Sequence, residues 1–232
     1  MTRYPIEAQQ VRPDPETGLP VLDREWVLRS HKGYWLLRRG QDILLSGLAL
    51  IVLSPLLLLT GLAVFLDDPH GSPFFKQARC GRDGKLFCMY KFRSMYVDAD
   101  QRLAALQTEG EMEGPVLRLR NDPRITRVGG FLRKTSIDEL PQLWNVLKGD
   151  MSIVGPRPAL PKEVALYKPI WRQRMYVTPG LTCIWQVTPN RDDVPFDRWV
   201  AMDLYYIQHR SFLLDWKLIL KTFGAIAGEQ GR

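Results

Sequence analysis

The chain has 232 residues, of which 45% are hydrophobic, and its formal net charge is +7 at pH 7. A chain of this length and composition can bury one core in addition to a membrane segment. The basic charge suits anionic lipid headgroups, nucleotide diphosphates or nucleic acid, and it does not choose among them. Three cysteines without metal-ligand spacing exclude a zinc site and indicate reduced cytosolic thiols.

The N-terminal region divides into two parts. Residues 1–25 are rich in proline and charge, which predicts an extended and loosely held tail. Residues 26–68 hold an amphipathic lead-in and then a long apolar segment. The remaining residues, 69–232, are predicted to form the globular part of the protein.

The apolar segment contains a proline at its centre. Ile43–Leu66 is a run of 24 residues without a charge, long enough to cross a bilayer core of about 30 Å. Pro55 lacks the N–H that would bond to the Ile51 carbonyl and clashes with it, whereas Ser54 can donate a hydroxyl hydrogen bond instead. Each half spans about 16 Å, the depth of one leaflet, and cations flank both ends. The residue pattern leaves a Pro-kinked single span and a re-entrant hairpin open.

The globular part carries mixed secondary-structure signals. The run Leu86–Met95 predicts a strand, Asp98–Leu106 predicts a helix, and Gly110–Pro123 carries turn signals. Lys162–Val177 predicts a further helix. Phe196–Ile226 predicts two helices whose rings and cations suit a core or a membrane interface. The expected fold class is therefore α+β, mostly helical with a small β element.

The most informative segment places two adjacent carboxylates between cations. The pair is Asp138 and Glu139, and the flanking cations are Arg133, Lys134, Lys148 and Arg157. A carboxylate can act as a nucleophile or hold a divalent metal, and arginine can grip phosphate oxygens through two hydrogen bonds, so this pattern favours phosphoryl chemistry. A structural interpretation is a helix start, with Ser136 as N-cap and Glu139 completing a capping box. The two interpretations are compatible, because helix N-termini attract anions.

Several ordered blocks together resemble the bacterial sugar transferases, the monotopic phosphoglycosyl transferase family that starts lipid-linked glycan assembly. The blocks are RRGQDILLSGLALIVLSPLLLL with its Ser54-Pro55 break, YKFRSM at Tyr90–Met95, RITRVGGFLRKTSIDELPQLWNVLKGDMSIVGPRP, TPGLTCIWQV, and DLYYI at Asp203–Ile207. They cover about residues 36–226. One block alone has little specificity, whereas all of them in this order make the resemblance highly specific.

The resemblance implies transfer of a sugar 1-phosphate from a UDP-sugar to a polyprenyl phosphate such as undecaprenyl phosphate, with release of UMP and with Mg²⁺ as cofactor. The family's dyad aspartate attacks the β-phosphorus, which makes Asp138 the expected covalent nucleophile. Glu139 is expected to assist in proton handling or, with Asp138, to hold the metal. The implied substrate-binding residues are Arg133, Arg157, Lys91, Arg93 and Asp203.

The resemblance also bears on the membrane. A polyprenyl phosphate stays in the bilayer, so the active site is expected at headgroup level, which favours the re-entrant hairpin. Residues 69–232 are then a catalytic domain with interfacial C-terminal helices, on the cytosolic face of the bacterial inner membrane. Membrane lipids are expected partners, and a homodimer is left open.

One block departs from the family pattern. Where relatives commonly continue the Gln-Val block with a Gly-Arg turn, this chain has Gln186-Val187-Thr188-Pro189-Asn190-Arg191. Arg191 is therefore predicted to supply the equivalent substrate-binding cation from a shifted position.

Two other functions are alternatives to the transferase. One is a single-pass anchor whose basic domain binds a protein partner, with the acidic pair serving only as a helix start. The other, suggested by the basic charge, is nucleic-acid binding. It is not expected, because basic and acidic residues are interleaved and no helix-turn-helix, RNP or zinc pattern is present. Release of UMP separates the transferase from both.

Overall fold

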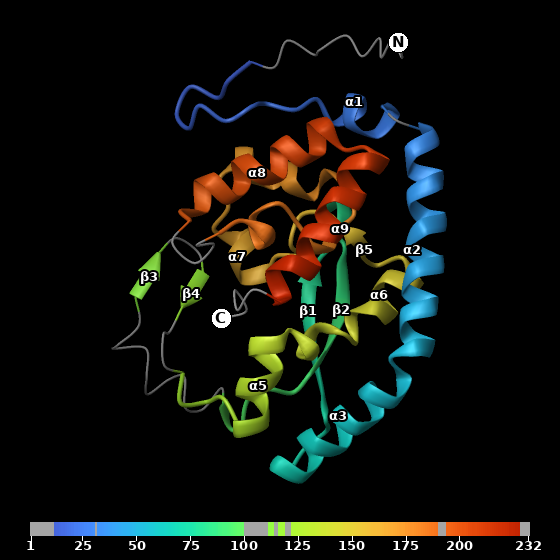
Figure 1. Ribbon diagram of the computed structural model, residues 1–232. Helices are drawn as coiled ribbons and strands as arrows, with labels where there is room; N and C mark the ends of the chain where they lie inside the picture. The colour runs from blue at the N-terminus through green and yellow to red at the C-terminus, as the bar shows by residue number, and fades with distance from the viewer. Residues whose placement is uncertain are drawn as a thin grey trace.

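The architecture is that of a computed structural model, which describes residues 12–30, 32–99, 111–113, 116–118, 122–189 and 194–227. This part is mostly helical with short strands, which confirms the α+β class (Figure 1). Its α-helices are α1 (Arg24–Arg29), α2 (Lys32–Val52), α3 (Ser54–Asp67), α5 (Arg127–Thr135), α6 (Gln142–Lys148), α7 (Pro161–Ala165), α8 (Phe196–His209) and α9 (Phe212–Ala227). Its 3-10 turns are η1 (Arg82–Gly84), η2 (Ile137–Glu139), η3 (Pro169–Tyr176) and η4 (Trp185–Val187).

The strands form two-stranded sheets. Within the described ranges, they are β1 (Phe74–Cys80), β2 (Leu86–Phe92), β3 (Glu111–Glu113), β4 (Val116–Arg118), β5 (Ser152–Val154) and β6 (Gly180–Thr182). β1–β2 and β3–β4 are antiparallel, whereas β5–β6 is parallel. The predicted strand at Leu86–Met95 is confirmed as β2, which pairs with β1 from Phe74 opposite Phe92 to Cys80 opposite Leu86. Figure 1 shows this hairpin running through the middle of the molecule.

Helices α2 and α3 form a bent pair. Neither these nor any other described helix is long and apolar enough to cross a membrane alone, but α2 and α3 together are, with a bend of 63° between them. The break lies at Leu53, directly before Ser54 and Pro55, and Ser54 Oγ donates to the Ile51 carbonyl at 2.8 Å as predicted. The pair exposes the apolar side chains Leu36, Leu37, Ile43, Leu44, Leu48, Ile51, Val52, Leu56, Leu58, Leu59, Leu62, Phe65 and Leu66. This surface could enter or span a membrane.

Hydrogen bonds and an ion pair on both sides of the bend connect the bent pair to the globular part. On α2, the Arg39 guanidinium donates to the carbonyls of Val146 and Leu147 at 2.7 Å each. These carbonyls lie in the last turn of α6, where a cation is favourable. Just after α3, Asp68 forms a buried ion pair with Arg93 at 2.8 Å. The bend between α2 and α3 is therefore anchored on either side.

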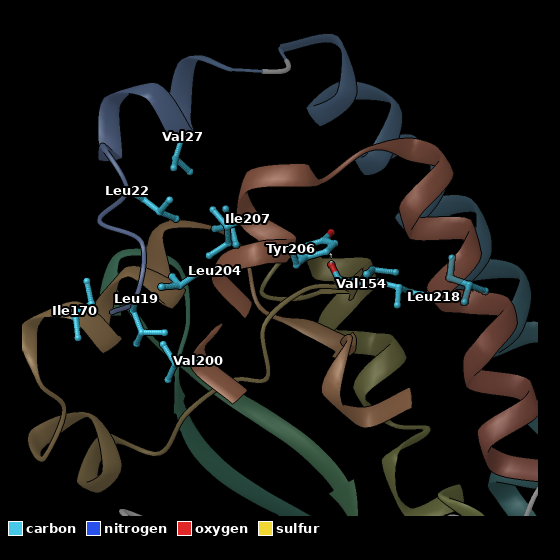
Figure 2. Close-up of a cluster of buried hydrophobic side chains, with 12 residues drawn as sticks. Leu19, Leu22, Val27, Val154, Ile170, Val200, Leu204, Tyr206, Ile207 and Leu218 are labelled. Atoms are coloured by element: carbon cyan, nitrogen blue, oxygen red, sulfur yellow. Dashed lines mark hydrogen bonds between the residues drawn. The ribbon is translucent and has the colours of Figure 1, made fainter. Parts of the chain in front are cut away.

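The main core joins segments that are far apart in the chain (Figure 2). Its buried side chains are Leu19, Leu22, Val27, Val154, Ile170, Val177, Val200, Leu204, Tyr206, Ile207, Leu218 and Ile219. The expected loosely held tail is therefore wrong for residues 12–25, because this segment places Leu19 and Leu22 in the core. The Leu22 N–H also donates to Gln173 Oε1 of η3. Residues 1–11 lie outside the described ranges.

The helix predicted over Lys162–Val177 is wrong as a single element. The chain forms α7, leaves the helix after Ala165, and begins η3 at Pro169. Lys168 has an extended backbone (φ −59°, ψ 152°), as expected for a residue whose helical conformation is disfavoured by the proline that follows. Pro169 therefore separates the two helical pieces.

The remaining element predictions have mixed outcomes. The pair of helices expected over Phe196–Ile226 is confirmed as α8 and α9. Turn signals at Gly110–Pro123 coincide with the described strands β3 and β4. Most of the helix expected over Asp98–Leu106 lies outside the described residues.

Candidate active site

The carboxylate pair lies on a short turn between α5 and α6. Ser136 has a left-handed backbone (φ 57°, ψ 16°), and its N–H donates to the Arg133 carbonyl. Asp138 and Glu139 follow in the 3-10 turn η2. The predicted capping box at Ser136 is wrong: its side chain makes no capping hydrogen bond, and a left-handed residue at this place ends α5.

A close backbone contact fixes α5, and with it the turn. Thr126 caps the helix by accepting a hydrogen bond from the Gly129 N–H at 2.9 Å. Gly129 lies so close to the segment after β2 that an added Cβ would be 2.0 Å from the Ser94 carbonyl oxygen. Only glycine permits this approach, which holds η2 beside β2.

Asp138 is a buried carboxyl group. Its exposed fraction is 7%, and burial raises its pKa to about 6. The Lys91 ammonium opposes this rise, the Glu139 carboxylate adds to it, and the Arg133 guanidinium opposes it. The Asp138 carboxylate is therefore poorly hydrated but still mostly ionised at neutral pH, a state that suits a nucleophile.

Lys91 serves both acids. Its Nζ donates to Glu139 Oε1 at 2.6 Å, and both side chains are partly buried. The same charge lowers the pKa of Asp138. Lys91 is located on β2, so the strand and the turn together build the acidic centre.

An open pocket lies beside Glu139. It draws on β1, β2, η2, α6, the Pro156–Pro158 segment, β6 and η4, and its lining residues are Arg79, Met89, Lys91, Glu139, Gln142, Arg157, Pro158, Gly180, Leu181 and Gln186. Polar side chains therefore converge on it from segments far apart in the sequence.

Arg157 lies in this pocket between Pro156 and Pro158. Its guanidinium carbon is 5.9 Å from the centre of the Trp185 ring, a cation–π arrangement. Within the described ranges, no carboxylate forms a salt bridge with it. The proline-flanked guanidinium is thus stacked on one side and left with donors for an anion.

Arg79 is a pocket residue that the sequence analysis missed. Its Nε and Nη2 donate to Gln77 Oε1 at 3.1 and 2.6 Å, and its Nη1 donates to the Pro158 carbonyl at 2.9 Å. Burial and then the Arg157 charge lower its pKa to about 10. The residues of β1 had not been predicted as a strand, so no pattern brought Arg79 toward the acidic pair.

Gln142 and Gln186 are two further pocket residues without a sequence prediction. Gln142 follows the acidic pair by three positions, and Gln186 is held by a hydrogen bond from the Cys183 thiol at 3.0 Å. Both lie within the sequence blocks that carried the family resemblance, which is the signal that could have marked them.

The structure places other predicted site residues away from the pocket lining. Arg93 pairs with Asp68 at the end of α3. Asp203 is almost fully buried and forms a 2.5 Å ion pair with Arg174, whose Nη2 lies 3.5 Å from the Arg157 carbonyl oxygen. Asp203 therefore lies behind the Arg157 segment and reaches it through Arg174.

Three more predicted cations have different locations. Arg133 is exposed on α5 and acts on Asp138 through its charge. Lys148 pairs with Asp150 at 2.9 Å and does not line the pocket. Arg191 lies outside the described residues.

The donor set for a metal consists of the two adjacent carboxylates. No group of three or more His, Cys, Asp or Glu side chains gathers as a metal site in the part of the chain that the structure describes. Mg²⁺ commonly takes one or two protein carboxylates and completes its shell with substrate phosphates and water. Asp138 and Glu139, next to a basic pocket, fit that kind of site.

A family model described as bacterial sugar transferase matches residues 33–229, nearly the whole chain. The chain belongs to the bacterial sugar transferase family. The family that the sequence blocks predicted is therefore confirmed. The matched residues include the Asp138–Glu139 turn and the basic pocket described above.

Relatives with curated names agree with this family. The galactosyl transferase CpsE of Streptococcus agalactiae serotype III is 46% identical over 67% of the chain and 35% of its own length. The exopolysaccharide production protein ExoY of Sinorhizobium fredii is 41% identical over 84% of the chain and 87% of its own length. The UDP-glucose:undecaprenyl-phosphate glucose-1-phosphate transferase of Xanthomonas campestris pv. campestris is 35% identical over 99% of the chain and 49% of its own length.

The name of the Xanthomonas campestris relative, a glucose-1-phosphate transferase, agrees with the prediction of a phosphoglycosyl transferase. The bacterial sugar transferase chain spans between about a third and a half of the length of several relatives and most of the length of others. The region that the family model matches, residues 33–229, holds the bent pair, the acidic turn and the pocket.

Proposed function

We propose that the protein transfers a sugar 1-phosphate from a UDP-sugar to a polyprenyl phosphate through a covalent intermediate on Asp138. The observation that carries this proposal is the buried Asp138 carboxyl group, which lies near the charges of Lys91 and Arg133 and directly before Glu139, a residue of the pocket that two arginines line. The names of the relatives, which include a UDP-glucose:undecaprenyl-phosphate transferase, support the substrate classes.

The first half-reaction uses the Asp138 carboxylate as nucleophile. One of its oxygens forms a bond to the β-phosphorus of the UDP-sugar, and the bond from that phosphorus to the bridging oxygen breaks. UMP leaves with the electron pair, and the sugar phosphate stays on Asp138 as an acyl phosphate. Because a poorly hydrated carboxylate has little water to shed, its burial suits this attack.

The second half-reaction regenerates the enzyme. A phosphate oxygen of the polyprenyl phosphate attacks the same phosphorus, the bond to Asp138 breaks, and the carboxylate is restored. The product is a polyprenyl diphosphate sugar, and no oxidant or net proton is required. A covalent intermediate lets the nucleotide leave before the second anion arrives, which reduces repulsion in the pocket.

Glu139 and Lys91 organise this centre. Their 2.6 Å ion pair fixes both side chains and leaves Lys91 close enough to lower the pKa of Asp138. We assign Asp138 and Glu139 as the residues that would hold Mg²⁺. When bound, the ion supplies positive charge that offsets the negative charge of the diphosphate.

The bent pair is proposed as a re-entrant membrane hairpin. Chain segments before and after it touch each other: Arg24 pairs with Asp83 at 3.0 Å, and Leu22 packs in the same core as Val200. These contacts support a topology in which both segments lie on one side of a membrane, because a single span through the bilayer would separate them. We place that side at the cytosolic face of the bacterial inner membrane, where UDP-sugars are available.

The experiment that tests the function is release of UMP. Detergent-solubilised protein receives Mg²⁺, polyprenyl phosphate and, one at a time, UDP-glucose, UDP-galactose and other UDP-sugars. We expect UMP with at least one donor, loss of UMP release in EDTA, and no UMP from Asp138→Asn. If no donor yields UMP, the transferase assignment fails, and a membrane-anchored partner-binding module becomes the better account.

A further inference from the structure

Two arginines line the pocket beside the acidic pair. The charges that act most strongly on Asp138 are Lys91, Glu139 and Arg133. Arg79 and Arg157 both line the pocket, and the Arg157 charge lowers the pKa of Arg79. The arginine pair and the acidic pair are therefore parts of one site, coupled through Glu139, whose charge acts on both Asp138 and Arg79.

Among the residues that the structure describes, the arginine pair has no bonded counter-charge. Within that part of the chain, Arg79 donates only to neutral oxygens, those of the Gln77 amide and the Pro158 carbonyl. The carboxylates of Glu139 and Glu163 lie near enough to favour its charge, but neither is within salt-bridge distance in the described residues. Two guanidinium groups that share a pocket repel each other, and a bound anion would remove that cost.

The fixed geometry of Arg79 leaves donors for such an anion. A guanidinium has five N–H groups, and the bonds to Gln77 and Pro158 use one on each of its three nitrogens. One N–H on Nη1 and one on Nη2 remain. Each of these can donate to an oxygen of a bound phosphate.

A buried amide completes the site. Gln142 has an exposed fraction of 3%, lines the pocket, and its side chain makes no hydrogen bond to another described residue. Its amide atoms are not among the fully buried side-chain atoms that lack a partner in the described residues, so the amide reaches the pocket, where a ligand can replace water. Its N–H₂ group can donate to a phosphate oxygen that the arginines hold.

We propose that Arg79, Arg157 and Gln142 form a seat for a phosphomonoester dianion. The two positive charges match a dianion, whereas the Glu139 charge is already paired with Lys91. Resting on the proposed function, the occupant is either UMP after it leaves the sugar phosphate or the phosphate of the polyprenyl acceptor. Both present the same chemistry to the seat.

The seat is tested by ligand-induced thermal stabilisation of the solubilised protein in EDTA, without substrate turnover. The probes are inorganic phosphate, UMP and geranyl phosphate, with uridine as the uncharged control. A ligand that binds the folded state raises the unfolding temperature with a concentration dependence that reports its Kd. We expect phosphate and at least one of the two esters to stabilise the protein, and uridine to have little effect; the stronger ester identifies the occupant.

Variants distinguish phosphate binding at the seat from a general effect of net charge on phosphate affinity. We expect Arg79→Gln to weaken phosphate binding about tenfold or more and Gln142→Met about threefold or more. Lys148→Gln removes the same charge at an exposed position outside the pocket and should bind phosphate as the wild type does. If Arg79→Gln fails to fold, the phosphate affinity of Gln142→Met, which preserves side-chain length, tests the seat.

Two results would overturn the seat. One is an unchanged phosphate affinity in Arg79→Gln or in a folded Gln142→Met, and the other is an equal loss of phosphate affinity in Lys148→Gln.

Failure of the seat is distinguishable from failure of the proposed function. If phosphate binding depends on Arg79 but the wild type releases no UMP, the seat is supported and the transferase proposal is rejected. UMP release with an unchanged KM in Arg79→Gln would remove the seat and keep the transferase.

Discussion

At the scale of the residue, Asp138 combines chemical utility with a cost in stability. A carboxyl group whose pKa rises from 3.8 to about 6 on folding stabilises the folded state while it is protonated. That contribution is present below about pH 4 and is lost as the pH rises through about 6, on the order of 3 kcal/mol in total. A buried charge retained at this cost is characteristic of functional sites.

Asp138→Asn is therefore expected to stabilise the protein at pH 7. Without Mg²⁺, the apparent Tm should rise by about 5 to 10 °C, because the amide stays neutral in the same buried place. Between pH 4 and pH 7 the wild type should lose Tm relative to this variant. Differential scanning fluorimetry in EDTA measures both, with the exposed Glu16→Gln as control; equal Tm values and parallel pH profiles would refute the burial of an ionised Asp138.

Arg157→Lys tests the fork geometry of the guanidinium. A lysine keeps the charge but cannot reproduce two parallel hydrogen bonds or the stacking on Trp185. We expect kcat/KM to fall about 10- to 100-fold, measured by UMP release, while Lys148→Arg leaves it unchanged. Near-normal kinetics for Arg157→Lys would show that only its charge matters.

At the scale of the element, the sequence was sufficient where the signal is local. The Ser54-Pro55 break, strand β2 and the last two helices were predicted because proline chemistry and apolar periodicity act over a few residues. The acidic pair was visible because its members are adjacent.

Features that depend on tertiary contacts were not predictable in the same way. Arg79 lines the pocket because β1 pairs with β2, and no local sequence pattern predicted β1. Ser136 has the residue type of an N-cap but ends α5 instead, because its left-handed backbone turns the chain into η2. The tail holds Leu19 in the core, although its proline and charge content predicted a loose segment.

Pro55→Leu tests the origin of the bend between α2 and α3. Pro55 lies in the first turn of α3, where proline is tolerated. Leucine restores the N–H that can donate to the Ile51 carbonyl and removes the clash, about 3 kcal/mol in a helix interior, that opposes a continuous helix. We expect a straighter pair and a loss of transferase activity in membranes, with Leu58→Ile on the exposed face as control. Full activity together with an unchanged bend would mean that the anchors at Arg39 and Asp68 set the geometry.

At the scale of the whole molecule, contacts on either side of the bent pair determine the expected topology. Because Arg24 pairs with Asp83, cysteines at Glu16 and Lys85 should lie on the same side of the membrane. In a background without Cys80, Cys88 and Cys183, both should resist a membrane-impermeant thiol reagent in intact cells and react after lysis. A cysteine of known periplasmic location serves as positive control. Labelling at Glu16 but not at Lys85 in intact cells would contradict the hairpin.

The same contacts connect membrane position with chemistry. α2 is bonded to α6, which follows the acidic turn, and the end of α3 is bonded to Arg93, which follows β2. A hairpin seated in one leaflet would therefore hold η2 and the pocket at a constant depth. This arrangement suits an acceptor whose phosphate stays at the membrane surface.

The most direct test of the account is to trap the intermediate. Solubilised protein is incubated with Mg²⁺ and a UDP-sugar but without polyprenyl phosphate, and the intact mass and the acid-quenched peptides are measured together with UMP. The account predicts a burst of about one UMP per active site, a mass increase of one sugar phosphate on the peptide that contains Asp138, and neither in Asp138→Asn. UMP release that requires the lipid, with no adduct on Asp138 under any donor, would contradict it.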